Sequence, residues 1–203
     1  MGYVPPYQRR VMASAIQVSL EFTPNPNTLK FVVNNKFLEK GASNFTSNAQ
    51  AQGKSPLAEA LFTVPGVSGV MIGTSFITIT KSPEGDWDVV AEKVPQIIET
   101  HLTQKLPVFA PGFNPEAEHT KSSSKPEDLE IEKKIRELLD TEIRPAVAMD
   151  GGDITFGKYE DGVVYLSLQG ACSSCPSSTA TLKMGVETRL KEVIPQVREV
   201  VQY

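Results

Sequence analysis

Apolar and polar residues alternate in two early stretches of the chain, and a turn-forming segment separates them. Residues 16–22 read IQVSLEF and residues 29–33 read LKFVV, which is the every-second-residue pattern of half-buried strands. The intervening TPNPNT at 23–28 combines prolines with asparagines, and both residue types favour turns. The pattern predicts a β-hairpin.

A short helix, a second hairpin and a long helix are predicted next. Ser55 and Pro56 provide an N-cap and a first helical residue for LAEALF at 57–62. The apolar runs 67–73 and 75–81, joined around Gly73-Thr74, indicate two further strands. Beyond Asp86, apolar residues recur at helical spacing at Val90, Val94, Ile97, Ile98 and Leu102. These elements predict an α+β domain in which the long helix covers the sheet.

The C-terminal region is also predicted to contain both helices and strands. Ile131, Ile135, Leu138 and Leu139 form a helical stripe, which we expect Pro145 to end near Arg144. The segment 153–169 predicts a hairpin that turns at Asp161-Gly162, with Val164, Leu166 and Leu168 on one face. A second helix carries Leu182, Val186, Leu190 and Val193, and VREVV at 197–201 predicts a last strand. The predicted order is α-β-β-α-β.

A proline- and serine-rich segment separates the two regions. Residues 107–128 contain four prolines and the run Ser122–Ser124, with no apolar periodicity after Phe113. We therefore expect an extended, solvated linker that lets two small domains move relative to each other. The predicted division is a flexible N-terminus at 1–14, an N-terminal domain at 15–106, the linker at 107–128 and a C-terminal domain at 129–203.

Composition excludes several classes of protein. The 203 residues are 40% hydrophobic and 22% charged, as in ordinary globular proteins. The formal net charge of −4 gives no basis for nucleic-acid binding, and no apolar stretch approaches the roughly 20 residues of a membrane span. With no secretory signal evident, we expect an intracellular protein, cytoplasmic if bacterial, with the mitochondrial matrix as the alternative.

Both cysteines of the chain lie in one short stretch, QGACSSCPSS at 169–178. Gly170 lets the chain leave the preceding strand, and Pro176 suits the first turn of the following helix. Unpaired amides and the helix dipole at such a position stabilise thiolates. We therefore expect Cys172 and Cys175 to be close to solvent and either reactive or metal-binding.

Four interpretations of the CxxC compete with each other. A structural disulfide or a pair of inert thiols is disfavoured, because an intracellular chain seldom keeps a disulfide and buried inert thiols do not favour helix-entry loops. Zinc needs four ligands, and only His101 and His119 accompany the thiols; we expect both to be ordinary histidines, on a helix edge and in the linker, which leaves zinc held between subunits. A thioredoxin-like thiol–disulfide oxidoreductase matches the order strand, CxxC, helix, although Pro176 follows the pair and Ala171 precedes it.

The remaining interpretation is an iron–sulfur cluster, which ordinarily takes four thiolates. One chain supplies two. The count predicts that two chains share a cluster between their CxxC loops. Such a cluster lies at an exposed interface and is easily passed on, which favours cluster transfer over permanent electron transfer.

Several segments resemble one known family. MDGGDITF at 149–156 and LQGACSSCPSSTATLKMGVE at 168–187 resemble the NifU C-terminal domain of Nfu-type proteins. FTPNPNTLKF at 22–31, SPLAEALF at 55–62 and GVSGVMIGTSFITITK at 66–81 resemble the N-terminal domain of the same family. The resemblance covers nearly the whole chain except its start and the linker.

The resemblance implies a scaffold or carrier and not an enzyme. Cys172 and Cys175 match the positions that hold a 4Fe-4S cluster, typically between subunits of a homodimer or higher oligomer. The implied partners are an upstream cluster donor and recipient apoproteins. We assign the N-terminal domain, which has no cysteine, to partner recognition or to modulation of the C-terminal domain. We expect DGGD at 150–153 to make the tight turn before the hairpin.

Overall fold

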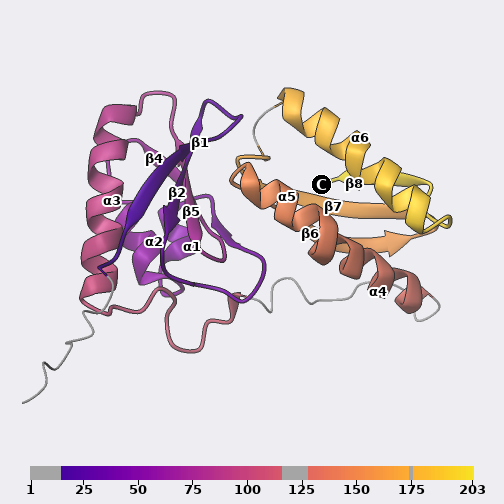
Figure 1. Cartoon of the computed structure of the whole chain (residues 1–203), viewed down its shortest axis with the longest axis horizontal. Coiled ribbons are helices and arrows are strands. Elements are labelled where there is room, and N and C mark those ends of the chain that lie inside the picture. The colour runs from indigo at the N-terminus through magenta and orange to yellow at the C-terminus, as the bar shows by residue number, and fades with distance from the viewer. Residues whose placement is uncertain (1–14, 116–127, 174–175) are drawn as a thin grey trace, which may run out of the picture.

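The computed structural model describes residues 15–115, 128–173 and 176–203, with the backbone alone over 176–180. The described residues form one five-stranded and one three-stranded sheet, each with its own hydrophobic core. Figure 1 shows the two parts side by side, with the N-terminal sheet facing the C-terminal part. The α+β fold class is confirmed. The predicted flexible terminus at 1–14 lies outside the described residues.

Five antiparallel strands and three helices make up the N-terminal part. They are β1 (Val18–Phe22), β2 (Thr28–Val33), β3 (Ser43–Phe45), α1 (Asn48–Ala51), α2 (Pro56–Leu61), β4 (Val67–Ile72), β5 (Phe76–Lys81) and α3 (Trp87–Thr103). The sheet order is β1-β2-β5-β4-β3. Both predicted hairpins and both predicted helices are confirmed. β3 and α1 are additional, and at three and four residues they are too short to show a period.

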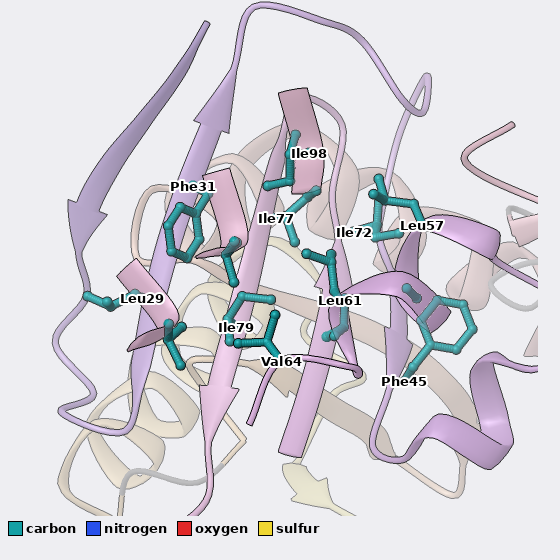
Figure 2. Packing of buried hydrophobic residues seen from close by; sticks show 14 of the residues in the cluster. Leu29, Phe31, Phe45, Leu57, Leu61, Val64, Ile72, Ile77, Ile79 and Ile98 are labelled. Atoms are coloured by element: carbon teal, nitrogen blue, oxygen red, sulfur yellow. The ribbon is translucent and has the colours of Figure 1, made fainter. Parts of the chain in front are cut away.

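Capping side chains fix where the two longer helices begin. The Ser55 side chain accepts a hydrogen bond from the Ala58 amide, with Pro56 in the first turn of α2. Asp86 caps α3 in the same way. The apolar stripe of α3 then lies over the sheet, where Val90, Val94 and Ile98 are fully buried. Figure 2 shows the resulting core, in which Phe31, Ile77 and Ile79 point toward the helices.

The opposite face of this sheet carries a different set of side chains. Because neighbours along a strand point to opposite faces, Lys30 and Thr78, which pair across β2 and β5, lie on the face away from the helical core. Met71 of β4 pairs with Thr78 on the same face. All three are nevertheless buried, at 8%, 1% and 1% exposed. This face is therefore covered, and the C-terminal part covers it.

The C-terminal part contains a three-stranded sheet with helices packed on one face. Its elements are α4 (Leu129–Leu138), the π-helical segment η3 (Leu139–Ile143), α5 (Arg144–Met149), β6 (Gly152–Glu160), β7 (Val163–Gly170), α6 (Pro176–Val193) and β8 (Glu199–Gln202). β6 and β7 form the predicted hairpin, and β8 pairs in parallel with β7 after the α6 crossover. The predicted order α-β-β-α-β is confirmed.

The prediction that Pro145 ends the first helix is wrong. The chain widens into η3 and continues as α5 to Met149, with Pro145 in the first turn of α5. Proline is tolerated there because the amide that it lacks has no α-helical partner at a new helix start. The extra turn carries the helix as far as the start of β6, beside the cysteine loop.

One core residue of α6 was also predicted wrongly. Val186 and Leu190 are buried as expected, but Val193 is 46% exposed and Ile194 is buried in its place. Both lie near one turn from Leu190, so periodicity alone does not separate them.

The predicted turn between β6 and β7 is confirmed, since Asp161 and Gly162 both adopt positive φ, at 50° and 85°.

Several of the first residues of the predicted linker pack against the N-terminal domain. Val108, Phe109 and Phe113 pack against the N-terminal core, and the Ala110 amide donates to the Lys54 carbonyl. Residues 116–127 lie outside the described part of the chain, so the 107–128 boundary stays a prediction. Within the described residues, no helix is long and apolar enough to cross a bilayer.

Candidate functional site

Cys172 lies in a tight loop between β7 and α6. Gly170 ends the strand with φ at +59°, a conformation that strongly favours glycine. The Cys172 amide then donates to the Gln169 carbonyl at 3.3 Å, and the Ser173 hydroxyl donates to the Gly170 carbonyl at 2.8 Å. The strand, loop and helix order of the sequence prediction is confirmed. Cys175 lies outside the described residues.

The Cys172 side chain points inward, so the expectation of a solvent-exposed thiol is wrong for this residue. It is 6% exposed and belongs to the C-terminal hydrophobic core. A Cβ on Gly152 would lie 2.4 Å from the Cys172 Sγ, so any side chain at position 152 would force the thiol to shift. The glycine of the DGGD segment thus makes room for the thiol.

A largely apolar hollow of about 550 Å³ adjoins Cys172. Its volume is in the range of small-ligand sites. Pro24 of the N-terminal part and Asp150 of the DGGD turn line it together with Cys172, and α5 and α6 supply most of the remaining lining. Cys172 therefore lies at the edge of a cavity between α5 and α6.

The DGGD segment makes the predicted tight turn. Gly151 adopts a φ of +76° between α5 and β6. Its carbonyl accepts a hydrogen bond from the Ala171 amide at 3.1 Å. The turn and the cysteine loop are therefore hydrogen-bonded to each other directly before Cys172.

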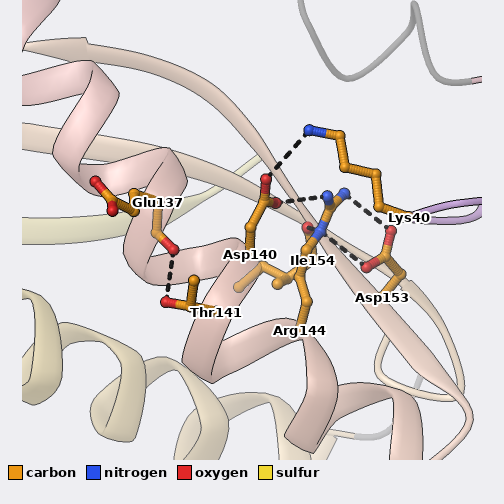
Figure 3. Close-up of polar contacts among 7 residues, drawn as sticks. All are labelled: Lys40, Glu137, Asp140, Thr141, Arg144, Asp153 and Ile154. Atoms are coloured by element: carbon orange, nitrogen blue, oxygen red, sulfur yellow. Dashed lines mark hydrogen bonds and ion pairs between the residues drawn. The ribbon is translucent and has the colours of Figure 1, made fainter.

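An arginine whose side chain is only 12% exposed fixes the same turn from the other side, as Figure 3 shows. Arg144 lies 3.2 Å from Asp153, whose side chain is 5% exposed, and 2.8 Å from Asp140. Its Nε also donates to the Ile154 carbonyl at 2.9 Å. Arg144 thus ties α5 to the start of β6, and Asp153 has a structural ion-pair partner.

The N-terminal sheet contacts the cysteine loop and the turn through hydrogen bonds. The Asn25 Nδ2 donates to the Ala171 carbonyl at 2.9 Å, the Thr78 hydroxyl to the Gly151 carbonyl at 2.7 Å, and the Lys30 Nζ to the Met149 carbonyl at 3.2 Å. The sequence identified Asn25 only as a turn residue, and no local pattern pointed to these three contacts. They depend on how two domains meet.

Ionised side chains fix α6 over the sheet. Arg189 donates to both carboxylate oxygens of Glu142 at 2.8 and 3.0 Å, which lowers the pKa of Glu142 below its usual value and raises the pKa of Arg189. Glu187 pairs with Lys191 and accepts from the Val200 amide, and both bonds lower the pKa of Glu187. α6, whose first turn follows the cysteine loop, is held to η3 and β8.

His101 does not lie near Cys172. His101 is buried in α3, and its Nε2 lies 3.0 Å from the Pro107 carbonyl oxygen. α3 covers the face of the N-terminal sheet that is opposite to the C-terminal part (Figure 1). His119 lies outside the described residues. Among the described residues, no three His, Cys, Asp or Glu side chains come together as a metal-ion site.

Comparison with known proteins finds two family matches. The model described as NifU-like domain matches residues 135–201, and the model described as scaffold protein Nfu/NifU N terminal matches residues 16–105. Together the two matches include most of both sheets.

Similar relatives come from fruit flies. The protein described as "NFU1 iron-sulfur cluster scaffold homolog, mitochondrial" of Drosophila persimilis is 41% identical over 204 residues, covering 98% of this chain and 71% of its own. The homologue of Drosophila grimshawi is 43% identical over 185 residues. This alignment covers 91% of the chain described here and 61% of the relative.

A solved NifU-like protein from Saccharomyces cerevisiae is 25% identical and covers 55% of this chain and 99% of its own. Its TM-score is 0.42, too low to support a fold assignment. Both domain matches and the long alignments with curated relatives agree with the resemblance found in the sequence. The chain belongs to the Nfu family of iron–sulfur cluster scaffold proteins, a family that is non-catalytic.

Proposed function

We propose that this protein is an iron–sulfur cluster carrier that binds a 4Fe-4S cluster through Cys172 and Cys175 and transfers it to apoproteins. The observation that carries the proposal is that its only two cysteines lie in one CxxC at the entrance to α6. Membership of the Nfu family and the scaffold role named for its fruit-fly relatives support it.

The cluster is cargo that two chains share. A 4Fe-4S cluster takes four thiolates, and each chain supplies two. A homodimer or higher oligomer therefore completes the ligand set. Because each chain holds only half of the ligands, thiolates of a recipient apoprotein displace them one by one, and an upstream donor loads the site in the same manner.

The cysteine loop suits this exchange. α6 begins at Pro176, one residue after Cys175, so the free amides of its first turn favour thiolates over thiols. Cys172 lines the hollow between α5 and α6, so the side of the loop that carries this thiol borders a cavity. The mitochondrial names of the relatives favour the mitochondrial matrix over a bacterial cytoplasm as the place of action.

Anaerobic reconstitution with iron and sulfide tests the proposal. The wild-type chain should yield a brown species whose native mass is at least that of a dimer. Cys172→Ser and Cys175→Ser should each abolish iron binding. Ser173→Ala is the matched control, because it changes the same loop by one hydroxyl that bonds the Gly170 carbonyl and leaves both thiols in place. A wild-type chain that stays monomeric and binds no iron would contradict the proposal.

The same preparations separate the alternative chemistry of the CxxC. A thiol–disulfide oxidoreductase would reduce insulin catalytically in its dithiol form. We expect no turnover from the wild-type chain and no difference between it and Cys172→Ser. Metal analysis of protein purified without air distinguishes iron from zinc held between subunits.

A further inference from the structure

The outer face of the N-terminal sheet meets the part of the C-terminal domain that carries the thiol. Three of its buried side chains, Asn25, Lys30 and Thr78, donate hydrogen bonds to backbone carbonyls across the domain boundary. They are 2%, 8% and 1% exposed. Buried donors need partners, and the three acceptors lie at the last residue of α5, in the turn and in the cysteine loop.

The Ala171 residue is held from both domains. Its amide donates to the Gly151 carbonyl at 3.1 Å, and its carbonyl accepts from Asn25 at 2.9 Å. The Gly151 carbonyl accepts a second bond, from the Thr78 hydroxyl at 2.7 Å. One short network therefore joins the N-terminal sheet, the turn and the residue that precedes Cys172.

Apolar contacts close the same boundary. A Cβ on Gly170 would lie 2.7 Å from the Met71 side chain, so the end of β7 approaches β4 closely. Ala148 of α5 packs against the small cluster of Ala42, Met71 and Phe76. At the rim, Lys40 lies 3.4 Å from Asp140 (Figure 3).

In this arrangement Cys172 is packed in the C-terminal core with 6% of its surface exposed. A cluster shared with a second chain requires that thiol to reach iron that the other chain also ligates. The loop must therefore turn Cys172 outward, and the bonds that Ala171 makes with the Asn25 side chain and the Gly151 carbonyl oppose this movement at the adjacent residue.

We propose that the N-terminal domain closes the cysteine loop of the cluster-free chain, and that loading a cluster requires the two domains to separate. The inference rests on the proposed cluster binding through Cys172. The boundary suits a reversible contact, because it combines a few hydrogen bonds, one exposed ion pair and a small apolar patch, as interfaces between mobile domains commonly do. The N-terminal domain then acts as a cover for the site, which gives a domain without cysteines a direct part in loading.

A zero-length cross-link reports the closed arrangement in the full chain. Carbodiimide joins the Lys40 amine to the Asp140 carboxylate only while the two side chains are in contact, and peptide mass spectrometry identifies the product. We expect this cross-link in the cluster-free wild-type chain, its absence in Lys40→Arg, and at least a fivefold lower yield after anaerobic loading. An unchanged yield in a chain that has bound iron would overturn the closure and leave the proposed function intact.

Asn25→Asp weakens the contact by removing a donor and by burying a carboxylate in the closed arrangement. The aspartate keeps the oxygen that accepts from the Asn27 amide at 3.0 Å, and it replaces the donor to Ala171 with an oxygen that faces a carbonyl. Asn34→Asp is the matched control, because Asn34 also accepts from one backbone amide and donates to one carbonyl, both within the N-terminal domain.

Removing one such bond should shift the closed-to-open ratio about fivefold. We expect Asn25→Asp to speed cluster uptake by at least that factor, because uptake follows the open population and the buried carboxylate adds to the lost bond. It should also lower the cross-link yield, with Asn34→Asp like wild type. Thr78→Val is a second variant with the same expectation, and Thr63→Val, which removes a hydroxyl bonded to the Ala60 carbonyl, is its control. Equal behaviour of Asn25→Asp, Thr78→Val and the controls would overturn the closure. A wild-type chain without iron would instead show that the proposed function itself is wrong.

Discussion

Replacing Arg144 with methionine should destabilise the C-terminal domain by more than the loss of any exposed ion pair in the protein would. The change removes a guanidinium that is 12% exposed from an Asp153 carboxylate that is 5% exposed. Breaking a buried ion pair by removing one partner costs about 3–5 kcal/mol. The second pair, with the 34% exposed Asp140, adds less than about 1 kcal/mol. Since methionine keeps part of the apolar stem, we expect a total loss near 3 kcal/mol.

Arg189→Met provides the matched control for this substitution. Arg189 also binds a carboxylate with two hydrogen bonds, but its side chain is 42% exposed and that of Glu142 is 43% exposed. Exposed pairs contribute about 0–1 kcal/mol. The two variants remove the same chemical group from the same domain, so the difference between them measures the effect of burial.

Fluorescence and circular dichroism distinguish the unfolding of the two domains in guanidinium. Trp87 is the only tryptophan and lies in α3 of the N-terminal domain, so its fluorescence follows that domain, whereas far-UV circular dichroism follows both. Arg144→Met should move the dichroism transition more than the fluorescence transition. Adding Asp153→Asn should recover at least about 1 kcal/mol, because the neutral amide no longer needs a cation. A loss below about 1 kcal/mol, or strict additivity in the double variant, would refute the reasoning.

Two further predictions concern single hydrogen-bonding side chains. Glu187 has a lowered pKa in the folded chain, so its contribution is complete above the unfolded value of about 4.3 and is lost as the pH falls through the lower folded value. Glu187→Gln should therefore cost up to about 1 kcal/mol at pH 7 in thermal unfolding and almost nothing near pH 3; an equal cost at both pH values would contradict this. Ser55→Ala removes the cap of α2 and a 2.7 Å bond to the Val108 carbonyl, so it should cost about 1–2 kcal/mol by Trp87 fluorescence, and a cost below about 0.3 kcal/mol would contradict the capping role.

Local patterns in the sequence predicted the helices and strands but not how the two domains contact each other. The turn at Asp161-Gly162 and the start of α2 at Ser55 follow from residue types that act within a few positions, and both are confirmed. Pro145 does not end the helix, because a π-helical segment before it lets the chain begin a new helical turn. Val193 is not the core residue, because Ile194 satisfies the same spacing and is buried instead.

The position of the thiol illustrates the same limit. The sequence placed Cys172 correctly between a strand and a helix, and small neighbours suggested exposure. The structure buries it because Gly152, from a segment twenty residues away, leaves space for its sulfur. The hydrogen bond from Asn25, at a separation of 146 residues, is likewise invisible to any local pattern. Burial at a domain boundary depends on tertiary contacts that a single sequence does not show.

Iron and sulfide content per chain, measured anaerobically beside the native mass, tests the central claim most directly. A 4Fe-4S cluster shared through Cys172 and Cys175 of two chains predicts about two iron and two sulfide per chain in a species of at least dimer mass. An iron-free monomer after reconstitution, or about four iron per chain on a monomer, would contradict it.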